Sequence, residues 1–370
     1  MKLAVVAGEA SGDLHASEVI RELRLLVPEL RTFGIGGDLL AREGMEILHH
    51  NREIGLVGFF NVLRQLPLFR RIFRELADRI AAERPDAVLL IDYPGFNLRM
   101  ARRCRELGIP VVYYISPQVW AWRRGRVKDI ARTVDKMIVI FPFEEAFYRE
   151  HDVDVAYVGN PLIEELAHIR RERPDTPAIR IALLPGSRLA EVDSLLPHML
   201  DAVRTLRATH AVDPFVVQAP TIRREQLERL IGSAGVPIVP HDGGEAVASA
   251  DVALSSSGTA TLECAVLGTP VVVMYRLSPV THWLALRLVK LPHFSLVNII
   301  AGKEVVPELL QHDVNGARIA REVLRVTEPA EHARITRELA AVKARLGDEG
   351  AARRAAAEII KLLDSMKGRA

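Results

Sequence analysis

Short apolar runs alternate with amphipathic stretches along this chain, and the alternation occurs in two separate series. Apolar runs that favour buried parallel strands occupy residues 3–7, 32–35, 87–91, 110–115 and 136–141, and then residues 180–184, 215–218, 238–240, 252–255 and 270–275. A charged stretch with prolines, residues 168–177, separates the two series. Strands that alternate with helices form open parallel sheets covered on both faces.

The sequence therefore predicts an α/β protein with two doubly wound, Rossmann-like domains that face each other across a cleft. We expect these domains at residues 1–165 and 178–345. The last segment, residues 346–370, is rich in Ala, Glu and Arg. It predicts a helix that packs back toward the first domain and tethers one domain to the other.

The composition indicates a globular protein and argues against a nucleic-acid-binding function. With 370 residues and 49% hydrophobic content, the chain can bury two sizeable cores. Its net charge of +2 does not indicate a nucleic-acid partner. The two cysteines, Cys104 and Cys264, lie in no metal-ligand or redox motif, which favours a reducing compartment. Every apolar run is shorter than the ~18 residues of a membrane span, so we expect a protein that is soluble or lies on a membrane.

The first strand of the second series ends in the sequence Leu-Pro-Gly-Ser-Arg. Gly186 and Ser187 place backbone N–H groups where a helix begins, and Arg188 adds a fork of donors. This arrangement suits a phosphate or pyrophosphate. An ordinary turn with a surface arginine is the alternative.

A second loop of small residues follows strand 252–255 and contains Ser257, Gly258 and Thr259. Small residues allow a ligand to approach the backbone, and the hydroxyls can cap the next helix. Glu263 lies four residues after Thr259, on the same helix face, where its carboxylate can accept hydrogen bonds from both hydroxyls of a ribose. A capped helix with a surface glutamate is the alternative, but two such loops on one domain favour a nucleoside diphosphate.

Asp92 directly follows strand 87–91 of the first series. It therefore lies at the edge of the sheet where α/β proteins bind ligands, and an acid there can act as a general base toward a hydroxyl. A turn aspartate before Pro94 is the alternative.

The loop after strand 3–7 has the position of a dinucleotide-binding fingerprint but the spacing G-x-x-x-G, which disfavours a dehydrogenase. We interpret Glu9, Ser11 and Asp13 as hydrogen-bonding groups for sugar hydroxyls or as closing contacts. Gly12 helps the turn pass into the helix.

The sequence from Ser116 to Trp122 follows a third strand and contains Trp120, with Arg123 next to it. Tryptophan and arginine at such a rim suit a sugar face and a phosphate. A solvated basic helix is the alternative for the arginines.

The segment 59–74 contains four of the eleven phenylalanines and four arginines, and Pro67 interrupts it. A basic, apolar segment of this kind indicates contact with an anionic membrane surface or with acyl chains. A contact between domains or between subunits is the alternative. The residues that we expect to make this contact are Phe59, Phe60, Leu63, Leu66, Phe69 and Phe73.

Asp152 and Asp154 match the D-x-D signature of metal-dependent sugar transferases. Because three residues are a weak signal and the histidines are scattered, we expect neither a metal nor another cofactor.

Together these motifs resemble the bacterial lipid-A-disaccharide synthases, which are GT-B glycosyltransferases. The matching stretches are Gly8–Asp13, Asp92 with Asn97, Ser116–Trp122, Leu183–Arg188, Ser257–Glu263 and Val297–Gly302. The resemblance runs from the first strand to about residue 311. It implies a metal-independent, inverting transfer of 2,3-diacylglucosamine from UDP-2,3-diacylglucosamine to the 6-hydroxyl of 2,3-diacylglucosamine 1-phosphate (lipid X).

The resemblance also implies roles for single residues. Asp92 matches the proposed general base, and Arg188 matches the arginine on the donor pyrophosphate. Glu263 is expected to bind the ribose, and Asn298 lies in the family's active-site loop. Gly95 and Asn160 depart from acidic and histidine residues found in some members.

The segment 59–73 matches the family's membrane- and acyl-binding region. The resemblance therefore implies a peripheral protein at the cytoplasmic face of the inner membrane. It implies no nucleic-acid partner, and it allows a homodimer. Two alternatives remain at this point. One is a UDP-N-acetylglucosamine 2-epimerase-like enzyme, and the other is a nucleotide-switched membrane-docking protein.

Overall fold

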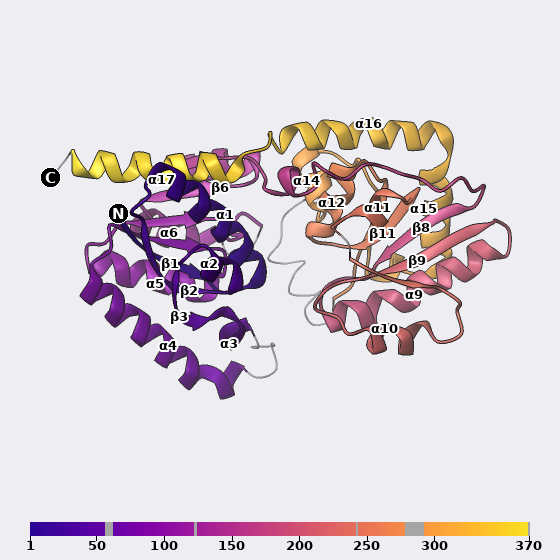
Figure 1. Ribbon diagram of the computed structural model, residues 1–370. Helices are drawn as coiled ribbons and strands as arrows, with labels where there is room; N and C mark the ends of the chain where they lie inside the picture. Colours follow the sequence, from indigo (N-terminus) through magenta and orange to yellow (C-terminus); the bar gives the residue numbers. More distant parts are fainter. Residues whose placement is uncertain (56–61, 122–123, 242, 278–291, 369–370) are drawn as a thin grey trace. The chain divides into compact units, whose positions relative to one another are not determined.

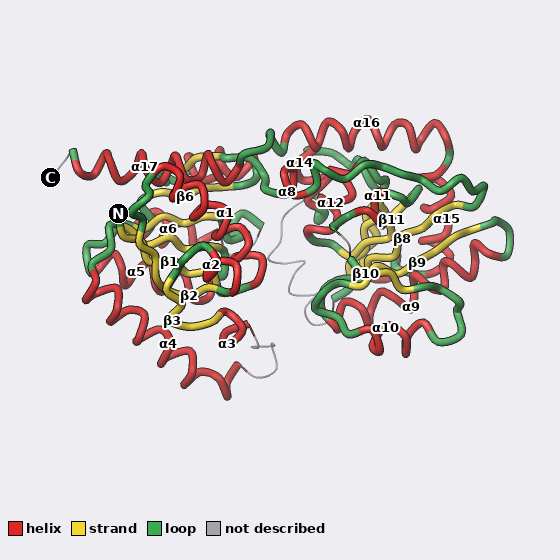
Figure 2. Tube along the Cα trace, viewed as in Figure 1, coloured by secondary structure: helices red, strands yellow, loops and turns green. Residues whose placement is uncertain are grey.

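The computed structural model describes residues 1–55, 62–121, 124–241, 243–277 and 292–368 (Figure 1). The chain divides into two compact units. Unit 1 comprises Met1–Pro161 and Asp348–Ala370, and unit 2 comprises Leu162–Gly347. Each unit contains one parallel sheet with helices packed on it, as the colouring by secondary structure shows (Figure 2).

The sheet of unit 1 has seven strands in the order β3-β2-β1-β4-β5-β6-β7, and every neighbouring pair is parallel. The strands are β1 (Lys2–Ala7), β2 (Arg31–Gly36), β3 (Glu46–His50), β4 (Ala87–Ile91), β5 (Val111–Tyr114), β6 (Lys136–Val139) and β7 (Val155–Tyr157). The central strands β1, β4, β5 and β6 are buried almost throughout, as their continuous apolar sequences predict.

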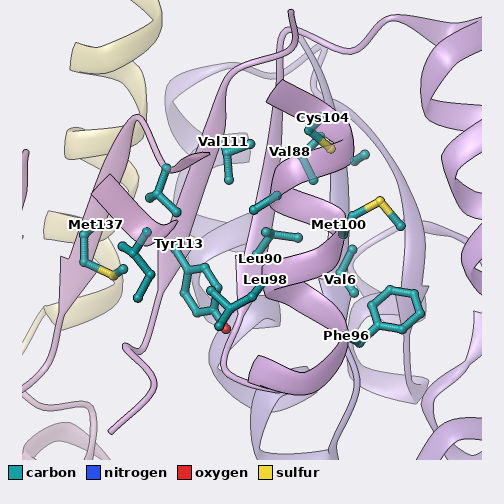
Figure 3. Close-up of a cluster of buried hydrophobic side chains, with 14 of the residues drawn as sticks. Val6, Val88, Leu90, Phe96, Leu98, Met100, Cys104, Val111, Tyr113 and Met137 are labelled. Atoms are coloured by element: carbon teal, nitrogen blue, oxygen red, sulfur yellow. The ribbon is translucent and has the colours of Figure 1, made fainter. Parts of the chain in front are cut away.

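Helices cover both faces of this sheet. They are α1 (Ala10–Leu26), α2 (Asp38–Arg42), α3 (Asn51–Gly55), α4 (Val62–Glu83), α5 (Pro94–Glu106), α6 (Val127–Thr133), α7 (Pro142–Arg149) and α17 (Ala351–Lys367), with a 3-10 turn at Arg124–Arg126. Helices α4, α5 and α6 share one core with the sheet. Figure 3 shows side chains of α5, among them Met100 and Cys104, beside Leu90 of β4 and Tyr113 of β5.

The sheet of unit 2 has six parallel strands in the order β10-β9-β8-β11-β12-β13. They are β8 (Ile179–Leu184), β9 (Val212–Gln218), β10 (Ile238–Pro240), β11 (Val252–Ser256), β12 (Val271–Tyr275) and β13 (Glu308–Leu310). Its helices are α8 (Leu162–Glu165), α9 (Leu189–Arg207), α10 (Arg224–Ile231), α11 (Glu245–Ala248), α12 (Thr259–Leu267), α14 (Leu296–Ala301), α15 (Gly316–Thr327) and α16 (Pro329–Arg345), with a 3-10 turn at Gln311–Asp313.

Both sheets reverse their strand order at one point, between β1 and β4 in unit 1 and between β8 and β11 in unit 2. The loops that leave the carboxyl ends of such a pair diverge to opposite faces, which leaves a crevice where α/β proteins bind ligands. The predicted α/β class with two doubly wound units is confirmed.

One connection differs from the sequence-based expectation, which treats residues 168–177 as a linker between the two domains. The charged stretch 168–177 belongs to unit 2, where Arg171 donates to the carbonyl of Ala250 (3.2 Å) and Arg173 pairs with Asp251 (2.9 Å). Helix α17 belongs to unit 1 and lies along α1 (Figure 1). In the described part of the chain, no helix is both long and apolar enough to cross a membrane.

Candidate active site

Unit 2 contains a cavity of about 320 Å³ at the carboxyl ends of β8 and β11, where its strand order reverses. All the residues that the sequence predicts for a nucleoside diphosphate line this cavity, namely Gly186, Ser187, Arg188, Ser257, Gly258, Thr259 and Glu263. The two loops come from strands that are neighbours in the sheet but about 70 residues apart in the chain. The structure therefore brings them together on one wall.

The loop after β8 requires a glycine at position 186. Gly186 has φ +119°, and a Cβ there would lie 2.4 Å from Oε2 of Glu191. Arg188 is the N-cap residue of α9, and its side chain is largely exposed. Its Nη1 lies 2.8 Å from Oε1 of Glu191, one helical turn further on. A guanidinium at a helix N-terminus is well placed to bind an anion.

The loop after β11 presents a buried carboxylate to the same cavity. Glu263 lies on the second turn of α12 and is only 7% exposed. His241 Nε2 lies 3.2 Å from each carboxylate oxygen, with hydrogen-bond geometry to Oε2. Among the described residues, none donates a hydrogen bond to Oε1. A buried acceptor in a cavity wall needs a donor, and a hydroxyl group of a bound ligand can supply one. His241 could not be predicted as a site residue, because it is a lone histidine after a three-residue strand.

In unit 1, the loops after β1 and β4 meet at the corresponding point of the sheet. Asp92 and Tyr93 have φ of +44° and +47°, and Ile115, at the end of neighbouring β5, has φ +62°. This conformation is strained for residues with a side chain, and above all for a β-branched isoleucine. Backbone strain at the ends of adjacent strands is typical of a functional site.

Buried side chains fix the backbone of Asp92 in this conformation. Asn97 Nδ2 donates to the carbonyl oxygens of Ile91 (3.0 Å) and Asp92 (2.8 Å). The hydroxyl of Tyr113 also donates to the carbonyl of Asp92 (2.5 Å). The predicted site residue Asn97 therefore positions Asp92 from beneath.

The carboxyl group of Asp92 binds its proton more tightly than an ordinary aspartate does. Burial, and then the negative charge of Glu9, raise its pKa to about 6, despite a backbone hydrogen bond from Tyr93 that favours the ionised form. A carboxylate with a pKa this close to neutral is a better proton acceptor than an ordinary aspartate and is still ionised at pH 7. No other acid described in unit 1 combines such a pKa with a place at the β1/β4 strand ends.

The loop after β1 contributes groups of two kinds. Glu9 and Ser11 are exposed, whereas Gly12 and Asp13 are buried. Asp13 Oδ1 accepts from the backbone N–H of Gly37 (2.6 Å), and Oδ2 accepts from that of Leu39 (3.0 Å). Both oxygens are therefore engaged with the turn that opens α2. Of the two interpretations of Asp13, these hydrogen bonds favour a closing contact and disfavour a group for sugar hydroxyls, while both interpretations remain for Glu9 and Ser11.

The loop after β5 is held by a buried polar network. Trp120 is 6% exposed, its ring packs edge-on against Phe143, and its Nε1 donates to Oε1 of Glu144 (3.0 Å). Ser116 Oγ lies 2.7 Å from the hydroxyl of Tyr148. This corrects the interpretation of Trp120 as an exposed surface for a sugar, because its ring and its N–H are both used inside unit 1.

Glu144 is a member of this network that sequence reasoning missed. It is 1% exposed and its Oε2 accepts from the backbone N–H of Phe141 (3.2 Å). Burial raises its pKa to about 8, against the opposing effect of the hydrogen bond from Trp120. The available signal was an acid at the third position of a helix that begins with proline, the position of a capping-box residue.

Asn298 is completely buried in unit 2. Its Oδ1 accepts from the N–H of Val305 (2.7 Å), and its Nδ2 donates to Oε1 of Glu308 (2.9 Å). Glu308 in turn accepts from the N–H of Ser295 (2.8 Å), just before α14. The side chain of Asn298 thus holds in place the loop between α14 and β13.

From residue 62 on, the apolar and basic segment forms the first part of α4, which continues through Pro67 where the sequence predicts an interruption. Leu66, Phe69 and Phe73 line an open cavity of about 500 Å³ between α4 and α5. Phe73 also packs edge-on against Phe96 (centroids 5.4 Å apart). Four arginines share the cavity wall, namely Arg70, Arg74, Arg99 and Arg103.

The remaining predicted residues are described less fully or lie elsewhere. Phe59, Phe60 and Arg123 lie outside the described residues, and for Leu63 only the backbone in α4 is described. Asp152 is exposed, and Asp154 pairs with Nζ of Lys136 (2.9 Å).

Comparisons with known proteins decide between the alternatives. A family model described as lipid-A-disaccharide synthetase matches residues 3–361. The chain belongs to this family. Two relatives with the name lipid-A-disaccharide synthase are 45% and 44% identical, from Myxococcus xanthus and Anaeromyxobacter dehalogenans. Each alignment covers 98% of this chain and 97% of the relative.

Solved structures with a similar fold include other sugar-nucleotide enzymes. The UDP-GlcNAc 2-epimerase from Neisseria meningitidis bound to UDP-GlcNAc has a TM-score of 0.62 at 14% identity, over 99% of this chain and 100% of that one. The calicheamicin glycosyltransferase CalG4 has a TM-score of 0.61 at 16% identity, over 99% and 98%. Fold alone therefore fits epimerases and transferases equally well. The family match confirms the resemblance to lipid-A-disaccharide synthases and does not favour the epimerase.

Proposed function

We propose that this chain transfers 2,3-diacylglucosamine from UDP to the 6-hydroxyl of 2,3-diacylglucosamine 1-phosphate, which yields the disaccharide 1-phosphate and UDP. The observation that carries the proposal is the family match over residues 3–361. The cavity at the strand-order reversal of unit 2 supports it, because residues of the required chemistry line it.

We assign the donor's UDP group to this cavity. Glu263 accepts hydrogen bonds from the ribose hydroxyls, and Oε1 is the buried oxygen available for one of them. Backbone N–H groups of Gly186 and Ser187, with the guanidinium of Arg188, face the pyrophosphate. When the bond from C1 of the sugar to the diphosphate breaks, these donors stabilise the negative charge on the leaving UDP. This role lets the transfer proceed without a metal ion.

We assign the role of general base to Asp92. It accepts the proton of the acceptor's 6-hydroxyl while the hydroxyl oxygen bonds to C1 of the donor sugar, opposite the departing UDP. The configuration at C1 is therefore inverted. The pKa of about 6 favours this role, because the group is ionised at pH 7 and its conjugate acid is weak enough for efficient proton transfer. Glu9 and Ser11 supply hydrogen bonds to the acceptor sugar.

We assign the acyl chains and the membrane contact to the first part of α4. Apolar side chains of this helix lie in one cavity with four arginines, a combination that suits acyl chains beside anionic head groups. This combination supports the peripheral location that we propose, at the cytoplasmic face of the inner membrane. A homodimer is compatible with this placement.

The experiment that tests the proposal is a product assay with both acylated sugars, read by mass spectrometry. We expect one disaccharide 1-phosphate and one UDP per turnover, with NMR of the product showing a β-1,6 linkage. A parallel incubation with UDP-N-acetylglucosamine alone tests the epimerase alternative. Epimerised product there, with no disaccharide in the first assay, would overturn the proposal.

A further inference from the structure

We infer that Glu191 is a positioning residue that directs Arg188 to the donor pyrophosphate. The inference rests on the proposed function, since it concerns the same donor cavity. Glu191 lies on the first turn of α9, and its Oε1 is 2.8 Å from Nη1 of Arg188. The side chain of Arg188 is 80% exposed, whereas that of Glu191 is 21% exposed. The carboxylate is thus the more enclosed partner and the guanidinium is the more exposed one.

The second carboxylate oxygen connects Glu191 to the phosphate loop. Oε2 lies 2.4 Å from the place where a Cβ on Gly186 would stand, so the carboxylate fills the space that the glycine leaves open. One oxygen therefore contacts the turn and the other contacts Arg188. This arrangement sets the distance between the guanidinium and the backbone N–H groups that are to bind the same diphosphate.

Arg188 needs such guidance because it lies between two cavities. It lines the donor cavity of about 320 Å³ and a neighbouring cavity of about 610 Å³, whose wall includes Tyr275 and Arg276. Glu191 lines both cavities as well. An arginine side chain has many rotamers, and fixing it before the ligand arrives lowers the entropic cost of binding. Without Glu191, the guanidinium is free to turn toward the second cavity.

A carboxylate near a diphosphate also repels it. Whether Glu191 raises or lowers the affinity for UDP is therefore a test of the inference. We expect Glu191→Ala to weaken UDP binding by about tenfold, because the loss of preorganisation exceeds the relief of repulsion. In an Arg188→Ala background the same change should not weaken UDP binding, because the residue that Glu191 directs is gone. Glu191→Gln, which keeps an oxygen for Arg188, should give an intermediate affinity.

Calorimetry with UDP and with uridine, on the two single variants and the double variant, tests the inference. Uridine lacks the diphosphate, so its affinity should be the same in the wild type and in Glu191→Ala. The matched control is Glu228→Ala on α10, which removes an exposed partner of Arg224 and should change neither affinity.

Each outcome has a distinct meaning. Equal or tighter UDP binding by Glu191→Ala overturns the inference, and so does a parallel loss of uridine binding, which would indicate general damage to the cavity. Weakening of equal size in the Arg188→Ala background overturns it too. If the wild-type protein binds UDP no better than uridine, the proposed donor site itself fails.

Discussion

Asp92→Asn should stabilise the protein while it abolishes transfer. The pKa of Asp92 rises from an ordinary 3.8 to about 6, chiefly through burial. At about 1.4 kcal/mol for each tenfold change in proton affinity, this rise corresponds to about 3 kcal/mol of destabilisation when the group is ionised. Since the carboxyl is half-buried, solvent reduces this value, and we expect the neutral amide to gain about 1–2 kcal/mol in the free energy of unfolding.

The stability that Asp92→Asn gains over the wild type must increase as the pH rises. Native Asp92 binds its proton more tightly than the unfolded chain does, so wild-type stability falls relative to the variant as the pH rises from about 4 to about 6. Below about pH 3 the carboxyl is protonated in both states, and the difference should vanish. Above pH 7 it should be complete and constant.

Thermal denaturation of both proteins at pH 4 to 8 measures this difference, and we expect a shift of a few degrees at pH 8. Asp152→Asn is a matched control, because Asp152 belongs to the same unit, has φ +57° and is exposed. UDP affinity of Asp92→Asn should equal that of the wild type. Equal melting temperatures of the two proteins at pH 8, or a difference in melting temperature that is independent of pH, would refute the assigned pKa. Near-normal turnover by Asp92→Asn would show that Asp92 is not the general base.

Three further predictions follow from the same geometry. Glu9→Gln removes the negative charge that raises the pKa of Asp92, so the acidic limb of the pH–kcat/KM profile should move to lower pH; an unmoved limb would contradict this coupling. Activity should be insensitive to EDTA and to Asp152→Asn, and restoration of lost activity by added Mg²⁺ or Mn²⁺ would instead indicate a metal-dependent transfer. Leu66→Ser should reduce co-sedimentation with anionic vesicles several-fold. The control Leu25→Ser, at a leucine that is 73% exposed, should not reduce it. Equal losses in the two variants would indicate that α4 does not bind the membrane.

The central strands and the edge strand β10 could be predicted from the sequence, whereas the edge strands β3 and β13 could not. Runs such as 87–91 and 252–255 are apolar throughout because both faces of a central parallel strand are covered. β3 (Glu46–His50) lies at a sheet edge, is mostly half-exposed and contains two histidines. β13 (Glu308–Leu310), at an edge of the other sheet, has three residues. Neither offers a period long enough to detect.

The positions of candidate site residues could be predicted, but the direction of their side chains could not. Position follows from the rule that ligands bind at the carboxyl ends of strands, which located Asp92 and Glu263. Direction depends on partners that are distant in the chain. Asp13 is engaged by N–H groups 24 to 27 residues away, and Trp120 is engaged by Glu144, 24 residues away. Nothing in the local sequence distinguishes such side chains from ones that face a ligand.

The membership of α17 in unit 1 has a consequence for biosynthesis. Unit 2 is continuous in sequence and can fold as soon as its residues have left the ribosome, whereas unit 1 needs residues that are synthesised after the whole of unit 2. Until then, Lys136 of β6, which is nearly buried in the finished protein, lacks its ion pair with Glu358 of α17 (2.8 Å). Unit 1 therefore matures after unit 2, and a chain that stops short of α17 should be more readily cleaved by proteases than the full chain.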